Sequence, residues 1–178
     1  MDYYILLIII IISTLYYIFN YQNCKIFNKI KYCINKESSD AKFKTLIKIK
    51  KNFNLFIKYL NEKHKDHDVT ININKNFKND IIFSELLNHK AIAYTKNKGE
   101  EMSFCLLDDE KKFNALMFVA LHELSHIATK DIGHTFKFWE NFKFLLQCSR
   151  DIKIYTPENY NEIPVNYCGL DITHNPLF

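Results

Sequence analysis

The chain contains few of the residues that allow tight loops, with three glycines and three prolines among 178 residues. A loop that cradles phosphate groups needs closely spaced glycines, so this scarcity argues against a nucleotide-binding loop. Arginine is scarcer still: Arg150 stands alone, and no recognised nucleic-acid-binding motif is present. We therefore expect no nucleic-acid partner, although the formal net charge is +4.

Cysteine is present in an odd number and without a Cys-x-x-Cys pair. The five residues are Cys24, Cys33, Cys105, Cys148 and Cys168. This pattern argues against a disulfide framework and against a zinc knuckle. Free thiols in a reducing compartment are the simpler expectation. Cys168 we expect to be buried, although as a thiolate it could also block a metal ion.

Charge is missing from the first part of the chain, where residues 3–19 are almost wholly apolar. With Asn20 and Tyr21 the uncharged span is long enough to cross a bilayer as a helix. A cleaved signal peptide is the alternative, but no positive residue precedes the run and no Ala-x-Ala follows it. We expect an uncleaved transmembrane anchor over residues 1–23. The lysines that follow place the C-terminal domain on the cytoplasmic side of a single-pass membrane protein.

Lysine dominates the next stretch, with nine lysines over residues 25–51 against Glu37 and Asp40. Three interpretations compete: a solvated linker that merges into a helix, a contact with anionic lipid headgroups, or a contact with nucleic acid. The solvated linker is the default. We therefore assign residues 24–39 to a basic linker beside the membrane.

The remainder, residues 40–178, is large enough for one domain of the α+β class. Apolar residues recur at helical spacing over 40–64, and Val69, Ile71 and Ile73 alternate with polar residues as in a half-buried strand. Residues 80–88 are ambiguous between helix and strand. The segments 91–95 and 102–107 flank Asn97-Lys98-Gly99 and predict a hairpin. A motif helix, a backing helix and a coil-rich tail over 155–178 complete the predicted order.

The chemistry is concentrated in the sequence HELSH within an apolar run. On a helix, His122 and His126 lie on one face, four residues apart, and can direct ring nitrogens to one metal ion. Glu123 is placed to accept a proton from a water molecule on that metal without being a ligand. The alternative is a buried helix with two satisfied histidines. A helix that is apolar all round is buried, however, and buried imidazoles are costly unless paired or metal-bound.

A catalytic zinc ion usually has three protein ligands and one open position. His134 follows Gly133, where the chain can reverse, and precedes a second helical pattern that begins near Phe136. We expect this turn to bring His134 back to the ion. The competing third ligands are Asp131, Glu140 and His174.

These motifs resemble the WLM-type zinc metallopeptidases of the broad gluzincin group. The similarity is carried by HELSH, by GHTFKFW and by the stretches AYTKNKGEEMSFCLLD and PVNYCGLDITHNPL, over roughly residues 91–178. It is greatest to the WLM-like proteins of large eukaryotic DNA viruses, and so implies a host or virion membrane. The resemblance implies a zincin-like fold, zinc on His122, His126 and His134, and Glu123 as the catalytic glutamate. Many WLM peptidases have about five residues between the motif and the third histidine, where this chain has seven.

We therefore expect a membrane-anchored zinc peptidase that acts on a protein or peptide substrate. Tyr160, Tyr167 or His174 could donate a hydrogen bond to the oxyanion, although each suits a packing role as well. The 102–107 strand is the candidate for binding substrate by strand addition. Two alternatives stay open: a zinc-stabilised scaffold without turnover, and a DNA-associated protease that acts on crosslinked proteins, which the wider WLM resemblance implies.

Overall fold

The computed structural model describes residues 2–19, 22–86 and 91–178. Helices and strands follow one another along the chain, with a long helical block between two groups of strands. In order, the elements are α1 (Asp2–Phe19), β1 (Gln22–Phe27), β2 (Ile30–Asn35), α2 (Asp40–Lys63), α3 (Asp68–Asn76), β3 (Ile82–Glu85), β4 (Ala93–Lys96), β5 (Glu101–Phe104), the 3-10 turn η1 (Glu110–Lys112), α4 (Phe113–Ala128), α5 (Phe136–Asp151), β6 (Val165–Tyr167) and β7 (Leu170–Ile172).

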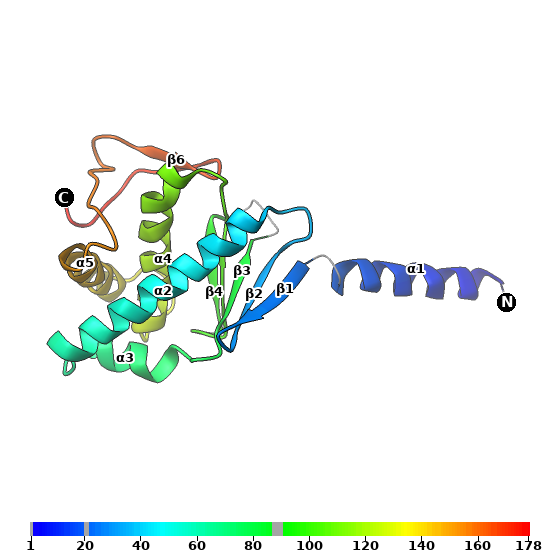
Figure 1. The fold of residues 1–178 in the computed structure, drawn as a ribbon, viewed down its shortest axis with the longest axis horizontal. Coiled ribbons are helices and arrows are strands. Elements are labelled where there is room, and N and C mark those ends of the chain that lie inside the picture. Colours follow the sequence, from blue (N-terminus) through cyan, green and yellow to red (C-terminus); the bar gives the residue numbers. More distant parts are fainter. Residues whose placement is uncertain (1, 20–21, 87–90) are drawn as a thin grey trace.

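Five strands form one mixed sheet in the order β1-β2-β3-β5-β4. Strand β3 runs parallel to β2 and β5, whereas β1 and β4 pair antiparallel at the two edges. Helices α2, α3, α4 and α5 lie to one side of this sheet, whereas α1 projects away from it (Figure 1). One row of paired residues across the sheet, Tyr32, Phe83 and Met102, is buried in the core. The predicted α+β class is confirmed.

Helix α2 follows the predicted amphipathic pattern and ends one residue before the expected His64. Its buried apolar side chains recur three or four residues apart, which places them on one stripe facing the core. They are Leu46, Ile49, Phe53, Phe56 and Leu60. Ser39 stands at its N-terminal cap position, and Asp40 complements the positive end of the helix dipole.

The expected membrane anchor over residues 1–23 is wrong. Among the residues that the structure describes, no helix is both long and apolar enough to cross a bilayer. Helix α1 has 18 residues, which at 1.5 Å per residue cover about 27 Å, less than the roughly 30 Å of a hydrocarbon core. The single-pass location with a cytoplasmic domain depended on that anchor and is overturned with it. Asn20 and Tyr21, which would have lengthened the span, lie outside the described residues.

The basic linker expected over residues 24–39 is replaced by strands. Most of this segment forms the hairpin β1–β2, and β2 pairs with β3 inside the main sheet. The strands were not recognised from the sequence because β1 has no buried residue, so the buried side chains, Ile30, Tyr32, Cys33 and Ile34, all lie in β2. The hairpin turns at Asn28 and Lys29, both with positive φ.

Two further expectations are corrected by local contacts. The strand expected from Val69 to Ile73 is helix α3, whose N-cap His67 accepts a hydrogen bond from the Val69 N–H at 3.2 Å. The expectation of free thiols fails for four cysteines, which form the disulfides Cys24–Cys33 and Cys105–Cys168. Cys148 is free and buried.

The remaining middle and tail segments follow the prediction in part. The hairpin appears as β4 and β5, and the ambiguous stretch holds β3, while residues 87 and 88 lie outside the described residues. The tail carries the small hairpin β6–β7. The tyrosines Tyr155, Tyr160 and Tyr167 of the tail are all at most 2% exposed, whereas Leu170 and Phe178 are exposed.

Candidate metal centre

Helix α4 carries the HELSH motif through the middle of the molecule. Nearly every residue from Ala115 to Ala128 is buried, as its apolar sequence requires. The helix begins at Phe113, so Asn114 lies in its first turn and not at its cap position. The Asn114 side chain instead exchanges two hydrogen bonds of 2.9 Å with the backbone of Thr156, which ties the tail to the start of α4.

The last carbonyl groups of α4 receive side-chain donors from neighbouring elements. The amide of Asn76 donates to Ile127 O at 3.0 Å, and that of Asn72 donates to Ala128 O at 2.9 Å. The Lys98 ammonium donates to Thr129 O at 2.8 Å. Because these carbonyls would otherwise lack intrahelical partners, the donors fix the end of the helix close to the motif.

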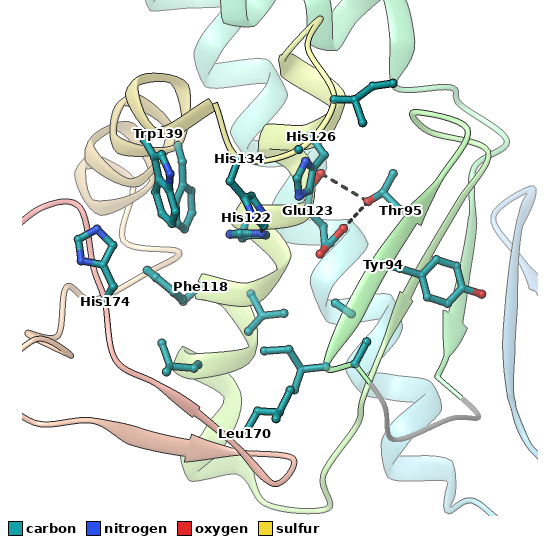
Figure 2. Close-up of a pocket in the computed structure, with 18 of the residues that line it drawn as sticks. Tyr94, Thr95, Phe118, His122, Glu123, His126, His134, Trp139, Leu170 and His174 are labelled. Atoms are coloured by element: carbon teal, nitrogen blue, oxygen red, sulfur yellow. Dashed lines mark hydrogen bonds between the residues drawn. The ribbon is translucent and has the colours of Figure 1, made fainter. Parts of the chain in front are cut away.

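Three histidines converge at the surface of α4 (Figure 2). His122 and His126 lie one turn apart on the helix, with ring centroids 5.0 Å apart. Their candidate ligand atoms and that of His134 all lie within 4.8 Å of one another, and the Nε2 atoms of His122 and His134 are 2.9 Å apart. Among the described residues this is the group of side chains that could hold a metal ion.

His134 reaches this position because the chain turns sharply between the two helices. Gly133 has φ +80°, a conformation that glycine adopts without steric cost. Thr135 then caps α5 by accepting the Phe138 N–H at 3.3 Å, and its hydroxyl donates to Asp131 at 3.2 Å. The seven residues between His126 and His134 are therefore compatible with a shared site.

Two aromatic rings pack against the three imidazoles. The ring of Phe138, which is fully buried, has its centroid 4.5–4.9 Å from those of all three histidines. Trp139 adds a second ring, 5.7 Å from His134. Neither ring offers a hydrogen bond acceptor, so the imidazole nitrogens are left to face one another and the cavity.

Burial keeps the two helix histidines uncharged. Burial, and then the neighbouring His126 and His134, lower the pKa of His122 to about 3. Burial, and then His134 and Lys98, lower the pKa of His126 to about 4. At neutral pH both rings are therefore neutral, which is the form of imidazole that binds a metal ion.

Glu123 lies beside the histidines but points toward strand β4. The residue is 6% exposed, and its carboxylate accepts a hydrogen bond of 2.8 Å from the Thr95 hydroxyl. Burial raises the pKa of Glu123 to about 7, although the Thr95 hydrogen bond acts to lower it. A carboxyl group that titrates near neutral pH is suited to accept and return a proton.

A cavity of about 910 Å³ opens over these groups. It is bounded by α4, by β4, by the loop before α5 and by β7 with the residues that follow it. Most of its wall is apolar, with the motif side chains as a polar cluster inside it. This combination of apolar walls and a few convergent polar groups is typical of a binding or active site.

Of the other candidate ligands and hydrogen-bond donors, some line the cavity and others do not. Asp131 and His174 line it without joining the three-histidine group, and the His174 ring lies 5.3 Å from that of Trp139. Glu140 pairs with Lys137 at 3.5 Å. Tyr167 donates to the Cys105 carbonyl at 2.6 Å, inside the core.

The expected substrate-binding strand, 102–107, is not at the edge of the sheet. Its strand β5 lies between β3 and β4, so both of its edges are occupied, and β4 is the edge strand. The Cys105 N–H donates to Ile92 O at 2.8 Å. In an antiparallel pair, the backbone groups of successive residues face alternately toward the partner strand and away from it. Because the Ile92 carbonyl faces β5, the N–H and C=O groups of Ala93 and Thr95 face the open edge of β4.

Sequence reasoning missed three residues of this site. Thr95 holds Glu123, Lys98 holds the end of α4, and Phe138 supports the imidazoles. Thr95 and Lys98 belong to the correctly predicted hairpin, but nothing in a local pattern says which helix lies beneath it. Phe138 was part of the quoted GHTFKFW motif, and its place in the first turn of the backing helix, four residues after His134, was the available signal.

Comparisons with known proteins yield viral relatives. The chain is 37% identical over 92 residues to "Uncharacterized protein R325" of Acanthamoeba polyphaga mimivirus, which is 49% of this chain and 47% of that protein. It is 32% identical over 82 residues to "Uncharacterized protein 136R" of Invertebrate iridescent virus 6, covering 43% and 44%. It is 38% identical over 86 residues to "Uncharacterized protein 042R" of Invertebrate iridescent virus 3, covering 44% and 50%.

The chain thus spans about half the length of the curated relatives that it matches. No protein-family model matches it, and no solved structure does. The names of the three relatives state no activity. Function is therefore inferred from the geometry of the site.

Proposed function

We propose that the protein is a zinc-dependent peptidase whose active site is the cavity beside α4. One arrangement supports this function above all others: three imidazoles that converge on one point, with a buried carboxylate on the adjacent residue of the same helix. A metal ion held at that point would bind a water molecule, and the adjacent carboxylate would accept a proton from that water.

The donor set suits zinc. Three imidazole nitrogens, two of them on neutral rings, match the three-ligand sites that hold catalytic zinc. Four of the five cysteines are in disulfides and the fifth is buried, so thiolate ligands do not compete. Zinc in such a site supplies Lewis acidity, which strengthens water as a nucleophile near neutral pH and polarises a carbonyl group.

Glu123 has the role of proton carrier in this proposal. The Thr95 hydroxyl donates to Oε2 and so orients the carboxylate. Oε1 then accepts the proton of the attacking water, and the same carboxyl group returns it to the amine that leaves when the peptide bond breaks. His174 is the remaining candidate for a hydrogen bond to the oxyanion, since it lines the cavity. Tyr167 donates to the Cys105 carbonyl in the core, and Tyr160 is fully buried and does not line the cavity.

Strand β4 would hold the substrate backbone. A peptide that lies along its open edge can pair with the free N–H and C=O groups of Ala93 and Thr95. This edge lies beside Glu123, because Thr95 of β4 donates a hydrogen bond to the Glu123 carboxylate. Strand addition would therefore bring a peptide bond to the carboxylate and the histidines together.

The direct test compares the full chain with its Glu123→Gln variant. We expect equal zinc content in the two proteins, because Glu123 is not a ligand, and loss of peptide hydrolysis by at least about a hundredfold in the variant. Release of new amino termini from a denatured protein substrate measures the activity. Equal hydrolysis by both proteins would remove Glu123 from the mechanism.

The two alternatives predict different results in separate measurements. A zinc-stabilised scaffold requires zinc for folding and hydrolyses nothing, and a fourth protein ligand would be found on the metal. A DNA-associated protease requires DNA binding that weakens steeply as salt is raised. Neither alternative is favoured by a specific contact among the described residues.

A further inference from the structure

Strand β1 is attached to the rest of the molecule chiefly through its neighbour β2. It is an edge strand of the sheet, and all of its residues after Gln22 are exposed. None of the β1 side chains, all of which the structure describes, belongs to the hydrophobic core, whose first member along the chain is Ile30 in β2. Burial of apolar surface, the dominant favourable term in folding, is therefore missing from β1.

Polar contacts hold β1 only weakly. The Gln22 amide donates to the Glu85 carbonyl at 3.2 Å. The Lys25 ammonium pairs with Asp40 at 3.2 Å and lies 5.1 Å from the centroid of the Phe43 ring. Both side chains of this ion pair are exposed, so the pair contributes little to stability. Backbone pairing with β2 completes the attachment, and pairing of this kind without a buried face gives only marginal stability in water.

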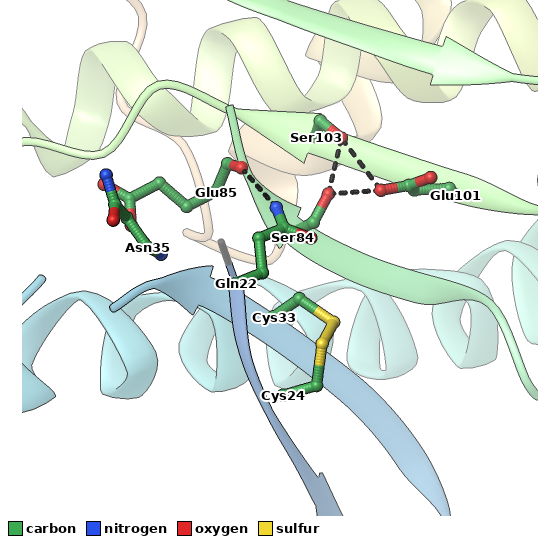
Figure 3. Close-up of a disulfide and its surroundings, with 8 residues drawn as sticks. All are labelled: Gln22, Cys24, Cys33, Asn35, Ser84, Glu85, Glu101 and Ser103. Carbon is green, nitrogen blue, oxygen red and sulfur yellow. Dashed lines mark hydrogen bonds between the residues drawn. A yellow bond between two sulfur atoms is a disulfide. The ribbon is translucent and has the colours of Figure 1, made fainter. Parts of the chain in front are cut away.

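The Cys24–Cys33 disulfide reinforces this weak attachment from the open face of the sheet. The two cysteines are directly opposite each other in the β1–β2 ladder. Tyr32 and Ile34 are buried in the core, so Cys33 between them points to the other face. Helices α2 to α5 cover the core face, and the disulfide lies on the same face as Ser84 (Figures 1 and 3). Cys24 is exposed, so a thiolate in solution can approach the disulfide from its side.

The second disulfide, Cys105–Cys168, has different surroundings. Cys105 is buried, and Tyr167, the residue before Cys168, is buried and donates to the Cys105 carbonyl at 2.6 Å. Ile172 of β7 is also part of the core. The β6–β7 hairpin therefore keeps its attachment to the core when its disulfide is broken, whereas β1 depends on Cys24–Cys33.

We propose that Cys24–Cys33 is a site of thiol–disulfide exchange with low-molecular-weight thiols, and that its reduction releases β1 from the sheet. A thiolate attacks Cys24 Sγ and forms a mixed disulfide, while the Cys24–Cys33 bond breaks and Cys33 leaves as a thiolate that takes a proton from water. A second thiolate attacks the sulfur of the first thiol in this mixed disulfide, and Cys24 leaves as a thiolate that is protonated likewise. The protein disulfide is thereby reduced, and two thiol molecules are oxidised to one disulfide.

Release of β1 changes two features of the molecule. Helix α1, which precedes β1, becomes joined to the domain by an unpaired segment. Strand β2 becomes the edge strand, and the backbone groups with which it paired β1 are opened to solvent. This exchange does not depend on the proposed peptidase function, because neither Cys24 nor Cys33 lines the cavity beside α4.

The full chain, oxidised in air and then held in graded concentrations of reduced glutathione, tests the exchange. Samples are alkylated at intervals, and mass spectrometry identifies the modified cysteines. We expect Cys24 and Cys33 to be modified at least about tenfold faster than Cys105 and Cys168, because a thiolate reaches an exposed disulfide more easily. Cys148, which is free and buried, should stay unmodified and so report that the chain remains folded. Equal rates for the two disulfides, faster reduction of Cys105–Cys168, or no reduction of Cys24–Cys33 would overturn the exchange site.

Hydrogen exchange measured on the same samples tests the release. After reduction, the backbone amides of residues 22–27 should exchange at least about tenfold faster, while those of residues 165–172 exchange as before. In Cys24→Ser/Cys33→Ser the amides of β1 should exchange fast without glutathione. Cys105→Ser/Cys168→Ser is the matched control and should keep the response of β1 to glutathione. Reduction of Cys24–Cys33 that leaves exchange in residues 22–27 unchanged would overturn the release of β1.

Discussion

At the scale of single residues, the site depends on imidazoles that stay neutral because they are buried. His122 and His126 have a pKa of about 3 and about 4 in the folded chain, against an ordinary value of 6.5. As pH falls below 6.5 the unfolded chain binds protons that the folded chain does not, so stability is lost. Glu123, with its raised pKa of about 7, acts in the opposite direction between pH 7 and 4.5.

The metal-free protein should therefore lose stability on mild acidification. Two imidazoles opposed by one carboxyl group give a net loss of about 1.4 kcal/mol per pH unit, or about 2 kcal/mol from pH 6.5 to pH 5. Urea unfolding in the presence of a chelator measures it. In the double variant His122→Gln/His126→Gln stability should no longer fall over this interval. An equal fall in both proteins would show that other groups control it.

A second residue-scale prediction concerns Lys50 on α2. Its side chain is 6% exposed, and the ammonium lies 4.4 Å from the centroid of the Phe77 ring. Burial lowers the pKa of Lys50 to about 8, so at neutral pH the folded chain holds a charge that it disfavours. Lys50→Met should raise the free energy of unfolding at pH 7 by about 2 kcal/mol.

The pH dependence identifies the cause of that gain. Stability of the unaltered protein should rise from pH 8 to pH 10.5, because over this interval only the unfolded chain still binds the Lys50 proton. The rise should be smaller in Lys50→Met and unchanged in Lys51→Met, whose side chain is exposed. A gain at pH 7 in both variants would point instead to a general effect of net charge.

At the scale of elements, tertiary contacts determined the secondary structure of a short segment that the local sequence pattern did not predict correctly. Residues 69–73 alternate like a strand, yet in α3 Val69, Thr70 and Ile73 are buried and Ile71 is half exposed. Nine residues are too few for alternation to exclude a helix, and the His67 cap was the overlooked signal. The long α2 and α4 were predicted correctly because many turns repeat one pattern.

The sheet was harder to predict because its order is not the order of the chain. Strands β2, β3 and β5 pair in parallel across the sheet, and no local spacing encodes those partners. Figure 3 shows how the N-terminal hairpin is attached: the Gln22 amide donates to the Glu85 carbonyl at 3.2 Å. The Cys24–Cys33 disulfide lies on the same face as Ser84 and Ser103.

The two disulfides should differ in their effect on stability. Cys105–Cys168 closes 63 residues and ties β7, a wall of the cavity, to the end of β5, whereas Cys24–Cys33 closes nine within one hairpin. Chain entropy predicts a loss of about 4 kcal/mol for Cys105→Ser/Cys168→Ser and about 2.5 kcal/mol for Cys24→Ser/Cys33→Ser. Urea unfolding without reductant measures both. A larger loss in the second pair would contradict the entropic ranking.

At the scale of the whole molecule, α4 is the element around which the site is assembled. The sheet edge reaches it through Thr95, α3 through Asn72 and Asn76, and the tail through Asn114. The sequence alone predicted that the three histidines would converge. Motif spacing on a helix places His122 and His126 on one face, and the turn at Gly133 brings back His134. The sequence could not predict the N-terminal hairpin, or that the cavity would be closed by β7.

The proposed function requires His122, His126 and His134 to bind one zinc ion and to leave one coordination position open. X-ray absorption spectroscopy on the zinc-loaded full chain, with zinc content measured in parallel, tests it most directly. We predict one zinc per chain, with three imidazole nitrogens and one non-protein oxygen in its coordination shell at about 2.0–2.2 Å. His134→Ala should lower the nitrogen count to two. A shell filled by four protein ligands, or no bound zinc, would contradict the claim.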